Sequence, residues 1–218
     1  MKMESDPVKL YTENIDAYLR HIRFARYPLG IRAYLLHSSL LGSDLRVLDA
    51  GCGTGVVTLA LREAVFTRKF RFGALDGFDL TPAMLERFAQ TLEARDIENV
   101  RLFKANVLDL KTLPRYCHEY SLIVSAGMLE YVPREKLADA LRGLRSRLAG
   151  DGTLLLFITR KNPITKLLIR RWWQGNLYTR SELEADFRGA GFTETSFKRF
   201  PLLFSYLNLW GHIVEARR

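Results

Sequence analysis

A glycine-rich turn and two carboxylates are the residues of this chain whose types and spacing best suit ligand binding. The segment Val47–Gly55 reads VLDAGCGTG, so an apolar strand runs directly into a turn with glycine at every second position. Glycine lets the backbone turn tightly and come close to a ligand, as in nucleotide sites between a strand and a helix. Asp79 follows Gly55 by 24 positions, and an acid about 20 residues on is placed to accept hydrogen bonds from ribose hydroxyls. The pattern predicts a site for a ligand that contains a nucleoside.

The glycine spacing and the neighbouring acid Asp49 narrow the class of ligand. The spacing is G-x-G-x-G, whereas nicotinamide and flavin proteins carry G-x-G-x-x-G, with a pyrophosphate at the helix N-terminus. Asp49 would also place negative charge beside a phosphate, but it suits a ligand that is cationic or rich in hydrogen-bond donors. S-adenosylmethionine has a sulfonium, an ammonium and no phosphate, so it fits this pattern better than NAD. The alternative is a tight strand-to-helix connection that binds nothing.

The elements that must position these residues follow from an alternation of apolar runs and helical spacing. Runs suited to buried strands are Leu45–Ala50, Phe72–Leu80, Val100–Asn106, Tyr120–Ala126 and Gly152–Thr159. Strands that alternate with helices predict a parallel sheet covered on both faces. Two further strand-like segments, Phe192–Phe200 and Phe204–Ala216, follow each other closely and predict an antiparallel hairpin. The expected fold class is α/β, a Rossmann-like sandwich with a seven-stranded, mostly parallel sheet, a C-terminal antiparallel hairpin and N-terminal helices.

Helix boundaries can be read from capping residues. After the glycine turn we expect a helix at Val56–Ala64, and Thr81 followed by Pro82 predicts the start of another. Leucines then repeat at helical spacing, at Leu137, Leu141, Leu144 and Leu148. Glycine at 150 and 152 predicts the end of that helix. A capping box at Ser181 and Glu184 predicts the last helix, which Gly191 closes.

The chain length of 218 residues predicts a single domain. Its expected parts are an N-terminal helical cap at 1–44, a cofactor-binding core at 45–160, a basic and aromatic lid at 161–180, and a closing helix and β-hairpin at 181–218. The first residues are polar, and no apolar run reaches the roughly 18 residues of a membrane span. The two cysteines, Cys52 and Cys117, show no disulfide spacing. We therefore expect a cytoplasmic protein.

The chain resembles the class I S-adenosylmethionine-dependent methyltransferases of the small-molecule type. The segments that carry the resemblance are Val47–Gly55, Gly77–Leu85, Ala105–Leu110, Tyr120–Pro133 and Leu148–Thr159. They are similar to the family's first motif, its ribose-binding acid, its adenine loop, its fourth strand and its fifth strand. The sequence departs from the family at Asn106, which stands where the usual acid contacts adenine. An Asn carbonyl can still accept a hydrogen bond from the adenine amine.

The resemblance implies S-adenosylmethionine as the cofactor and assigns a contact to each matching residue. It implies contacts at Asp49, Gly51, Cys52 and Gly53 for the methionine part, at Asp79 for the ribose, at Leu80, Met84, Asn106 and Val107 around the adenine, and at Ala126 and Gly127 for the floor. A methionine on a helix face is more often a core residue, so Met84 is the weakest of these assignments.

The acceptor is harder to identify than the cofactor. Methyl transfer is an in-line displacement, so the protein has to hold the acceptor in line and exclude water. A general base is needed only for an acceptor that loses a proton of high pKa, and we name none, because Tyr131 stands where many relatives carry histidine. The expected substrate contacts are Tyr131, Arg170, Trp172 and Trp173. No residues have metal-ligand spacing, so we expect no metal.

Two acid-free segments contain most of the excess positive charge. The net charge is +9, and four arginines lie in Ala17–Ser43 and six basic residues in Arg160–Arg180, with no acid in either. In the resembling family, these regions cover the acceptor pocket. In the second segment, the spacing of Ile164, Leu167, Leu168 and Trp172 predicts a helix. Either its apolar side chains pack on the domain while the basic ones face water, or it meets an anionic, partly apolar acceptor or an anionic membrane.

These observations predict an enzyme that transfers a methyl group to a small or amphiphilic, anionic metabolite. A small-molecule or lipid-like acceptor ranks first, with peripheral membrane contact; nucleic acid ranks second and protein third. No Asn/Asp-Pro-Pro-aromatic tetrad follows the fourth strand and no Pro-Cys pair exists, which disfavours methylation of nucleic-acid bases. The alternatives are an RNA methyltransferase, or a non-catalytic S-adenosylmethionine-binding protein that uses its basic face for a partner.

Overall fold

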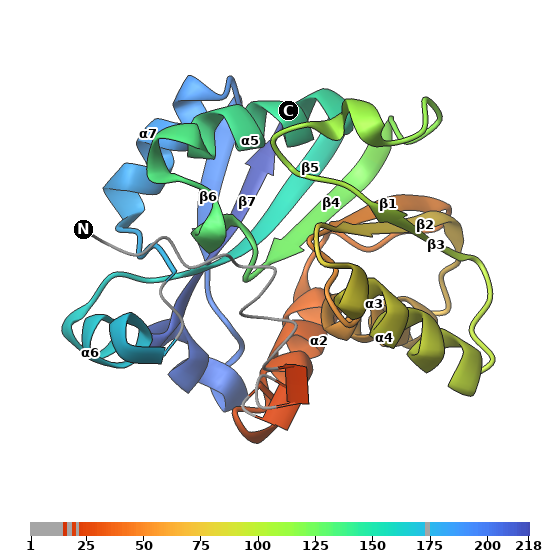
Figure 1. Cartoon of the computed structure of the whole chain (residues 1–218), viewed down its shortest axis with the longest axis horizontal. Helices are drawn as coiled ribbons and strands as arrows, with labels where there is room; N and C mark the ends of the chain where they lie inside the picture. Colours follow the sequence, from red (N-terminus) through yellow and green to blue (C-terminus); the bar gives the residue numbers. More distant parts are fainter. Residues whose placement is uncertain (1–14, 17–18, 21, 173–174) are drawn as a thin grey trace.

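The computed structural model describes residues 15–16, 19–20, 22–172 and 175–218, with only the backbone at 168–172 (Figure 1). One seven-stranded sheet has the order β3-β2-β1-β4-β5-β7-β6. Its parallel strands are β1 (Leu45–Ala50), β2 (Phe72–Asp79), β3 (Val100–Lys104), β4 (Tyr120–Ala126) and β5 (Leu148–Thr159). The antiparallel pair is β6 (Glu194–Lys198) and β7 (Gly211–Arg217), and β7 pairs with β5. The predicted fold class is confirmed.

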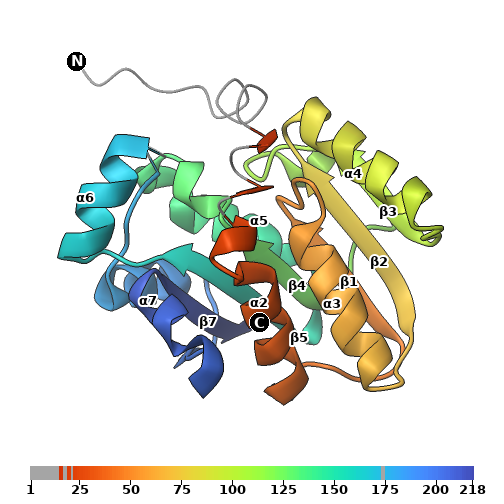
Figure 2. The ribbon, with the colours of Figure 1, turned by 90° about the horizontal axis from the view of Figure 1, so that it is seen from below.

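Helices cover both faces of this sheet (Figure 2). One face carries α2 (Tyr27–His37), α3 (Val56–Thr67) and α4 (Pro82–Ala94), and the other carries α5 (Leu137–Arg147) and α7 (Arg180–Gly189). The alternation along β5 explains the two layers: Leu154 and Leu156 pack in the core with α5 and α7, whereas Leu155 and Phe157 pack with α2 and α3. The helix α6 (Pro163–Trp172) follows the end of β5.

The structure confirms the predicted start of α4 and corrects the end of α5 and the start of α7. Pro82 opens α4 and Thr81 is its N-cap as predicted, but the Thr81 side chain makes no capping hydrogen bond. Helix α5 ends at Arg147 and not at Gly150, because Leu148 already pairs with Tyr120 in the sheet.

The capping box of α7 lies two residues earlier than predicted from Ser181 and Glu184. The Thr179 hydroxyl accepts from the backbone N–H of Glu182, and the Glu182 carboxylate accepts from the N–H of Thr179 at 2.7 Å. Both pairs have the required spacing, and the helix begins at the earlier one. Gly191 closes the helix with a φ of +87°, as predicted.

The segment Phe204–Ala216 is only partly a strand, contrary to the prediction. Residues Leu202–Leu209 form the 3-10 helix η4, and β7 begins at Gly211. An apolar run without alternation does not distinguish a strand from a helix. In the N-terminal cap, α2 is confirmed, and residues 1–14, 17–18 and 21 lie outside the described part of the chain. Among the residues that are described, no helix is long and apolar enough to cross a membrane.

A buried carboxylate joins the two halves of the sheet at its amino end. Asp76 on β2 is fully buried and accepts hydrogen bonds from Arg101 at 2.6 and 2.9 Å and from the Tyr120 hydroxyl at 2.6 Å. Arg101 lies on β3 and Tyr120 on β4, so one side chain connects three strands. A buried charge is tolerated only where such partners satisfy it.

We expect Arg101→Met to lower the free energy of unfolding by about 2 kcal/mol, because it leaves the Asp76 carboxylate without its charged partner. Urea unfolding followed by circular dichroism measures this loss. Lys104→Met, an exposed change on the same strand, is the matched control and should shift stability by under about 0.5 kcal/mol. Equal effects of the two substitutions would contradict a stabilising role of the pair.

Candidate functional site

The glycine turn lies at the carboxyl end of the central strand β1. Gly51, Gly53 and Gly55 all have positive φ, at +75°, +52° and +84°, a region that favours glycine. A Cβ on Gly51 would meet Met128 at 2.4 Å, and one on Gly55 would meet the Phe88 ring at 2.1 Å. A Cβ on Gly53 would have no neighbour within 4 Å. The outer glycines therefore serve packing as well as the turn, and Gly53 borders open space.

Asp79 ends the neighbouring strand β2 and is hydrogen-bonded to the turn. Its Oδ2 accepts from the Gly53 N–H at 2.9 Å and its Oδ1 from the Thr81 N–H at 2.8 Å. Burial raises the pKa of this carboxyl, while the two backbone donors oppose the rise. Carboxylate oxygens have further acceptor capacity, so Asp79 can still accept hydrogen bonds from a ligand.

Asp49 lies beneath the turn and does not line a cavity, which the sequence did not predict. It is fully buried, its Oδ2 accepts from the Thr58 hydroxyl at 2.5 Å, and its Oδ1 has no hydrogen-bond partner among the described residues. Burial raises its pKa to about 7, with an opposing contribution from Thr58 and a further rise from Asp79. Direct contact of Asp49 with a methionine group stays a prediction.

The Cys52 side chain also points away from the ligand space. It is 4% exposed and packs with Phe88 and Leu92. Burial is the main cause that raises the pKa of its thiol, and nearby Asp49 and Asp79 add to it. Cys52 belongs to the lining of the larger cavity described below, and its buried thiol stays protonated and inert.

A cavity of about 200 Å³ opens between the turn and the ends of β2, β3 and β4. Nine of the eleven predicted cofactor residues line it: Gly51, Gly53, Asp79, Leu80, Met84, Asn106, Val107, Ala126 and Gly127. Sequence reasoning missed Phe78, Thr81, Ala105, Leu108, Met128, Val132 and Pro133, which complete the wall. The side-chain oxygen Oδ1 of Asn106 accepts from the Leu108 N–H at 2.9 Å, so this oxygen is engaged within the loop. The side-chain NH₂ of Asn106 remains for a ligand.

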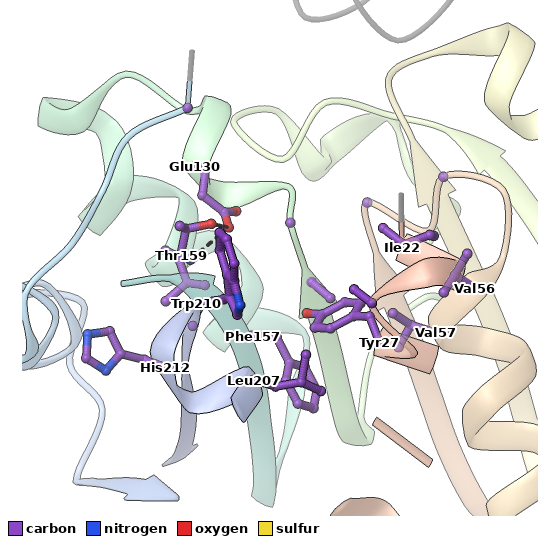
Figure 3. Close-up of a pocket in the computed structure, with 18 of the residues that line it drawn as sticks. Ile22, Tyr27, Val56, Val57, Glu130, Phe157, Thr159, Leu207, Trp210 and His212 are labelled. Carbon is purple, nitrogen blue, oxygen red and sulfur yellow. Dashed lines mark hydrogen bonds between the residues drawn. The ribbon is translucent and has the colours of Figure 1, made fainter. Parts of the chain in front are cut away.

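A larger cavity of about 690 Å³ begins at the same turn. It shares Gly51, Gly53, Ala126, Gly127 and Tyr131 with the smaller one. Its other walls are mainly apolar, and Figure 3 shows Ile22, Val56 and Val57 across the space from Trp210, with Tyr27, Phe157 and Leu207 at its base. The two cavities thus meet at the glycine turn, with Tyr131 lining both.

Two polar side chains face this apolar space, Glu130 and Thr159, whereas the His212 ring points away from it toward Phe197 and the Tyr178 carbonyl (Figure 3). Glu130 is 5% exposed, and its Oε1 accepts from the Thr159 N–H and hydroxyl, both at 2.9 Å. Its Oε2 has no partner among the described residues, and burial raises its pKa. Burial lowers the pKa of His212, which favours the neutral ring.

The sequence analysis named Tyr131 and overlooked its neighbour Glu130. The available signal was an acid inside the otherwise uncharged run Ser125–Val132, directly after a buried strand. His212 had no such signal, because it reaches the cavity only through the pairing of Gly211 with Thr159.

Three predicted substrate contacts are not tested. Arg170 and Trp172 belong to α6, but their side chains lie outside the described residues, as does Trp173 entirely. In the described part of α6, Ile164 is 51% and Leu167 is 75% exposed. The interpretation that these two side chains pack on the domain is wrong.

Comparisons with known proteins agree with this geometry. Residues 47–152 match the family described as "Methyltransferase domain". A ribosomal protein L11 methyltransferase of Porphyromonas gingivalis is 32% identical over 136 residues, which are 61% of this chain and 40% of that protein. A carboxy-S-adenosyl-L-methionine synthase of Stutzerimonas stutzeri is 31% identical over 113 residues, 52% of this chain and 44% of that protein. The chain therefore spans less than half the length of these curated relatives.

Solved structures share the fold. A magnesium protoporphyrin IX methyltransferase from Synechocystis PCC 6803 with bound SAH superposes with a TM-score of 0.63 at 20% identity, over 89% of this chain and 83% of that chain. An O-methyltransferase family protein from Burkholderia thailandensis reaches 0.71 at 14% identity, over 93% and 59% of the two chains. Residues 47–152 are therefore similar to a methyltransferase domain, and the fold is the one shared by these solved structures.

We expect Asp49→Asn to change how stability depends on pH. The raised pKa of Asp49 means that its stabilising contribution is greatest below its ordinary value and is lost as pH rises from about 4 through about 7. The wild-type protein should therefore lose stability relative to Asp49→Asn, on the order of a few kcal/mol over this window. Thermal unfolding at a series of pH values measures the difference.

Asp139→Asn is the matched control, because that carboxylate is exposed on α5. If the thermal stability of the wild-type protein and of Asp49→Asn changed in parallel with pH, the pKa of Asp49 would not be raised.

Proposed function

We propose that this chain transfers a methyl group from S-adenosylmethionine to a small or amphiphilic acceptor. The observation that carries the proposal is the meeting of two unlike cavities at one glycine turn, a small one beside a carboxylate and a large apolar one. A two-substrate transfer needs such a junction, because the reacting groups have to be aligned within contact distance.

The smaller cavity suits the nucleoside of the cofactor. Asp79 would accept from the ribose hydroxyls, Leu80 and Val107 would enclose the adenine, and the Asn106 amide would donate to it. The backbone around Gly53 and Gly127 would border the methionine, since a Cβ at either position has open space before it. The bound cofactor supplies a methyl group already activated by its sulfonium.

The larger cavity suits an acceptor with a sizeable apolar body. Its side chains exclude water, and Glu130 with Thr159 forms a fixed polar point where an acceptor group can be oriented. The unpartnered Oε2 of Glu130 holds a proton when neutral and accepts one when ionised.

The negative charge of the acceptor is part of the proposal and rests on Arg26. Among the described residues, Arg26 is the one lysine or arginine in the lining of the larger cavity. An amphiphile with an anionic group at the mouth and its apolar part inside would match both features. RNA fits this lining less well, because RNA-binding sites stack bases on accessible aromatic rings along cationic grooves.

We expect the wild-type protein to bind S-adenosylhomocysteine with micromolar affinity in a calorimetric titration and to ignore NAD. Asp79→Ala should weaken this binding by about 100-fold, because two hydrogen bonds to a charged acceptor are lost. Glu98→Ala, an exposed acid on the loop before β3, is the control and should bind as wild type.

Thermal unfolding checks that Asp79→Ala is folded, and Asp79→Asn provides a second variant that keeps the shape of the side chain. A folded wild-type protein without affinity for S-adenosylhomocysteine would mean that the turn is only structural.

We expect label from methyl-labelled S-adenosylmethionine to enter the organic phase when the protein is incubated with an amphiphile extract. Label in purified RNA, or no label in any acceptor despite tight cofactor binding, would favour the RNA or the non-catalytic alternative. Glu130→Gln should lower the transfer rate by about tenfold or more while leaving affinity for S-adenosylhomocysteine unchanged. Glu135→Gln, exposed in the next turn, is the matched control.

A further inference from the structure

One side of the molecule exposes large apolar side chains at its corners. We define this docking face by three segments: 22–29 before and at the start of α2, 160–167 at the start of α6, and η4 at 202–209. Phe24 is 92%, Leu202 91%, Leu203 80% and Leu167 75% exposed. Figures 1 and 2 both show α2, α6 and the dark blue segment before β7 along the same side. Most soluble proteins do not expose so many large apolar side chains together.

Hydrogen bonds join these three segments into one continuous surface. The Asn162 amide donates to the Leu209 carbonyl at 2.6 Å, which fixes the start of α6 to η4. The Tyr206 hydroxyl donates to the Ala25 carbonyl at 2.8 Å, which fixes η4 to the segment before α2. The exposed side chains are therefore held in place relative to one another by the fold.

The three segments of this face carry cations and no acid, and the acids that meet them come from other elements: Glu182 pairs with Lys161 at 3.3 Å, and Glu63 lines a pocket with Arg23. Acidic residues are absent from 17–43, 160–180 and 195–214, the stretches that contain its three segments. Exposed cations lie in these same stretches, at Arg20, Arg23, Arg26, Arg160, Lys166 and Arg199. Apolar side chains flanked by cations match the boundary between headgroups and acyl chains of an anionic membrane.

A lipid surface explains the face better than a second copy of the chain. Two copies joined through this face would bring arginine against arginine, with no acid within the three segments to pair them. The apolar side chains also project from separate helical segments, Phe24 ahead of α2 and Leu202 and Leu203 on η4, and do not line one groove. We propose that the docking face binds peripherally to an anionic lipid bilayer.

The larger cavity opens onto this face. Phe24, Arg26, Tyr206 and Trp210 line the cavity and belong to, or directly adjoin, the docking face. Docking would therefore set the cavity mouth against lipid, so that an amphiphilic acceptor enters without crossing water. This last step rests on the proposed function, whereas the docking itself does not.

Co-sedimentation of the full chain with vesicles tests the proposal without cofactor or acceptor. We expect binding to vesicles of phosphatidylcholine mixed with phosphatidylglycerol, little binding to phosphatidylcholine alone, and weaker binding at high salt. The double substitution Leu202→Ser/Leu203→Ser should weaken binding more than tenfold, because it removes two inserted side chains. Arg23→Glu/Lys166→Glu, which reverses two exposed cations of the face, should do the same, at about fivefold or more for each cation.

Matched controls lie at the amino end of the sheet. Phe66→Ser removes a half-exposed ring, and Lys69→Glu/Arg71→Glu reverses two exposed cations; both should bind vesicles as wild type. Unchanged affinity for S-adenosylhomocysteine shows that each variant is folded.

Equal binding to both vesicle types, or no effect of the docking-face variants, would overturn the proposal. So would a dimer in light scattering that the Leu202→Ser/Leu203→Ser variant dissociates. Loss of methyl transfer with vesicle binding intact would instead count against the proposed function.

Discussion

The hydrogen bonds between the ends of β1 and β2 are the constraint on which the candidate site depends. Gly51 and Cys52 donate to the Phe78 carbonyl at 2.9 Å, and Gly53 donates to the Asp79 carboxylate. These bonds turn the chain sharply after β1 while holding the carboxylate beside it. The two strands are parallel neighbours, with Ala50 paired to Phe78, so the turn satisfies its own backbone donors on the adjacent strand. A buried ligand site can therefore exist before any ligand binds.

The sheet order gives its two halves different roles. Strands β1, β2 and β3 end at the smaller cavity, whose walls combine a carboxylate, an amide and aliphatic side chains. Beyond β4, the end of β5 and the reversal into β7 add Thr159 and His212 to the larger cavity. The antiparallel direction of β7 is essential here. It brings the end of η4 to the edge of the sheet where the parallel strands end, whereas a parallel strand in this place would begin at the opposite edge.

Sequence patterns predicted the walls of the smaller cavity far better than those of the larger one. Glycine spacing and strand ends are local properties, so nine of the predicted cofactor residues line one cavity. Asp49 and Cys52 are the exceptions. The direction of the Asp49 side chain depends on strand register, which places it under α3 against Thr58. Glu130, His212 and the 3-10 helix η4 were missed because their roles come from contacts between distant segments. An uncharged run such as Phe200–Trp210 has no periodicity that reveals whether it will be a strand or a helix.

The uneven distribution of charge connects the larger cavity with the outer surface around its mouth. The segments that line the larger cavity must be apolar toward the interior, yet the exposed side chains of the same segments are also apolar or basic. If these segments met only water and a closed pocket, the exposed positions would carry acids as often as the rest of the chain does. Outside the two acid-free segments first identified, 23 basic residues stand against 24 acids, so the bias is confined to the region around the cavity mouth. A requirement on the outer surface of this region, in addition to the packing of its core, accounts for that confinement.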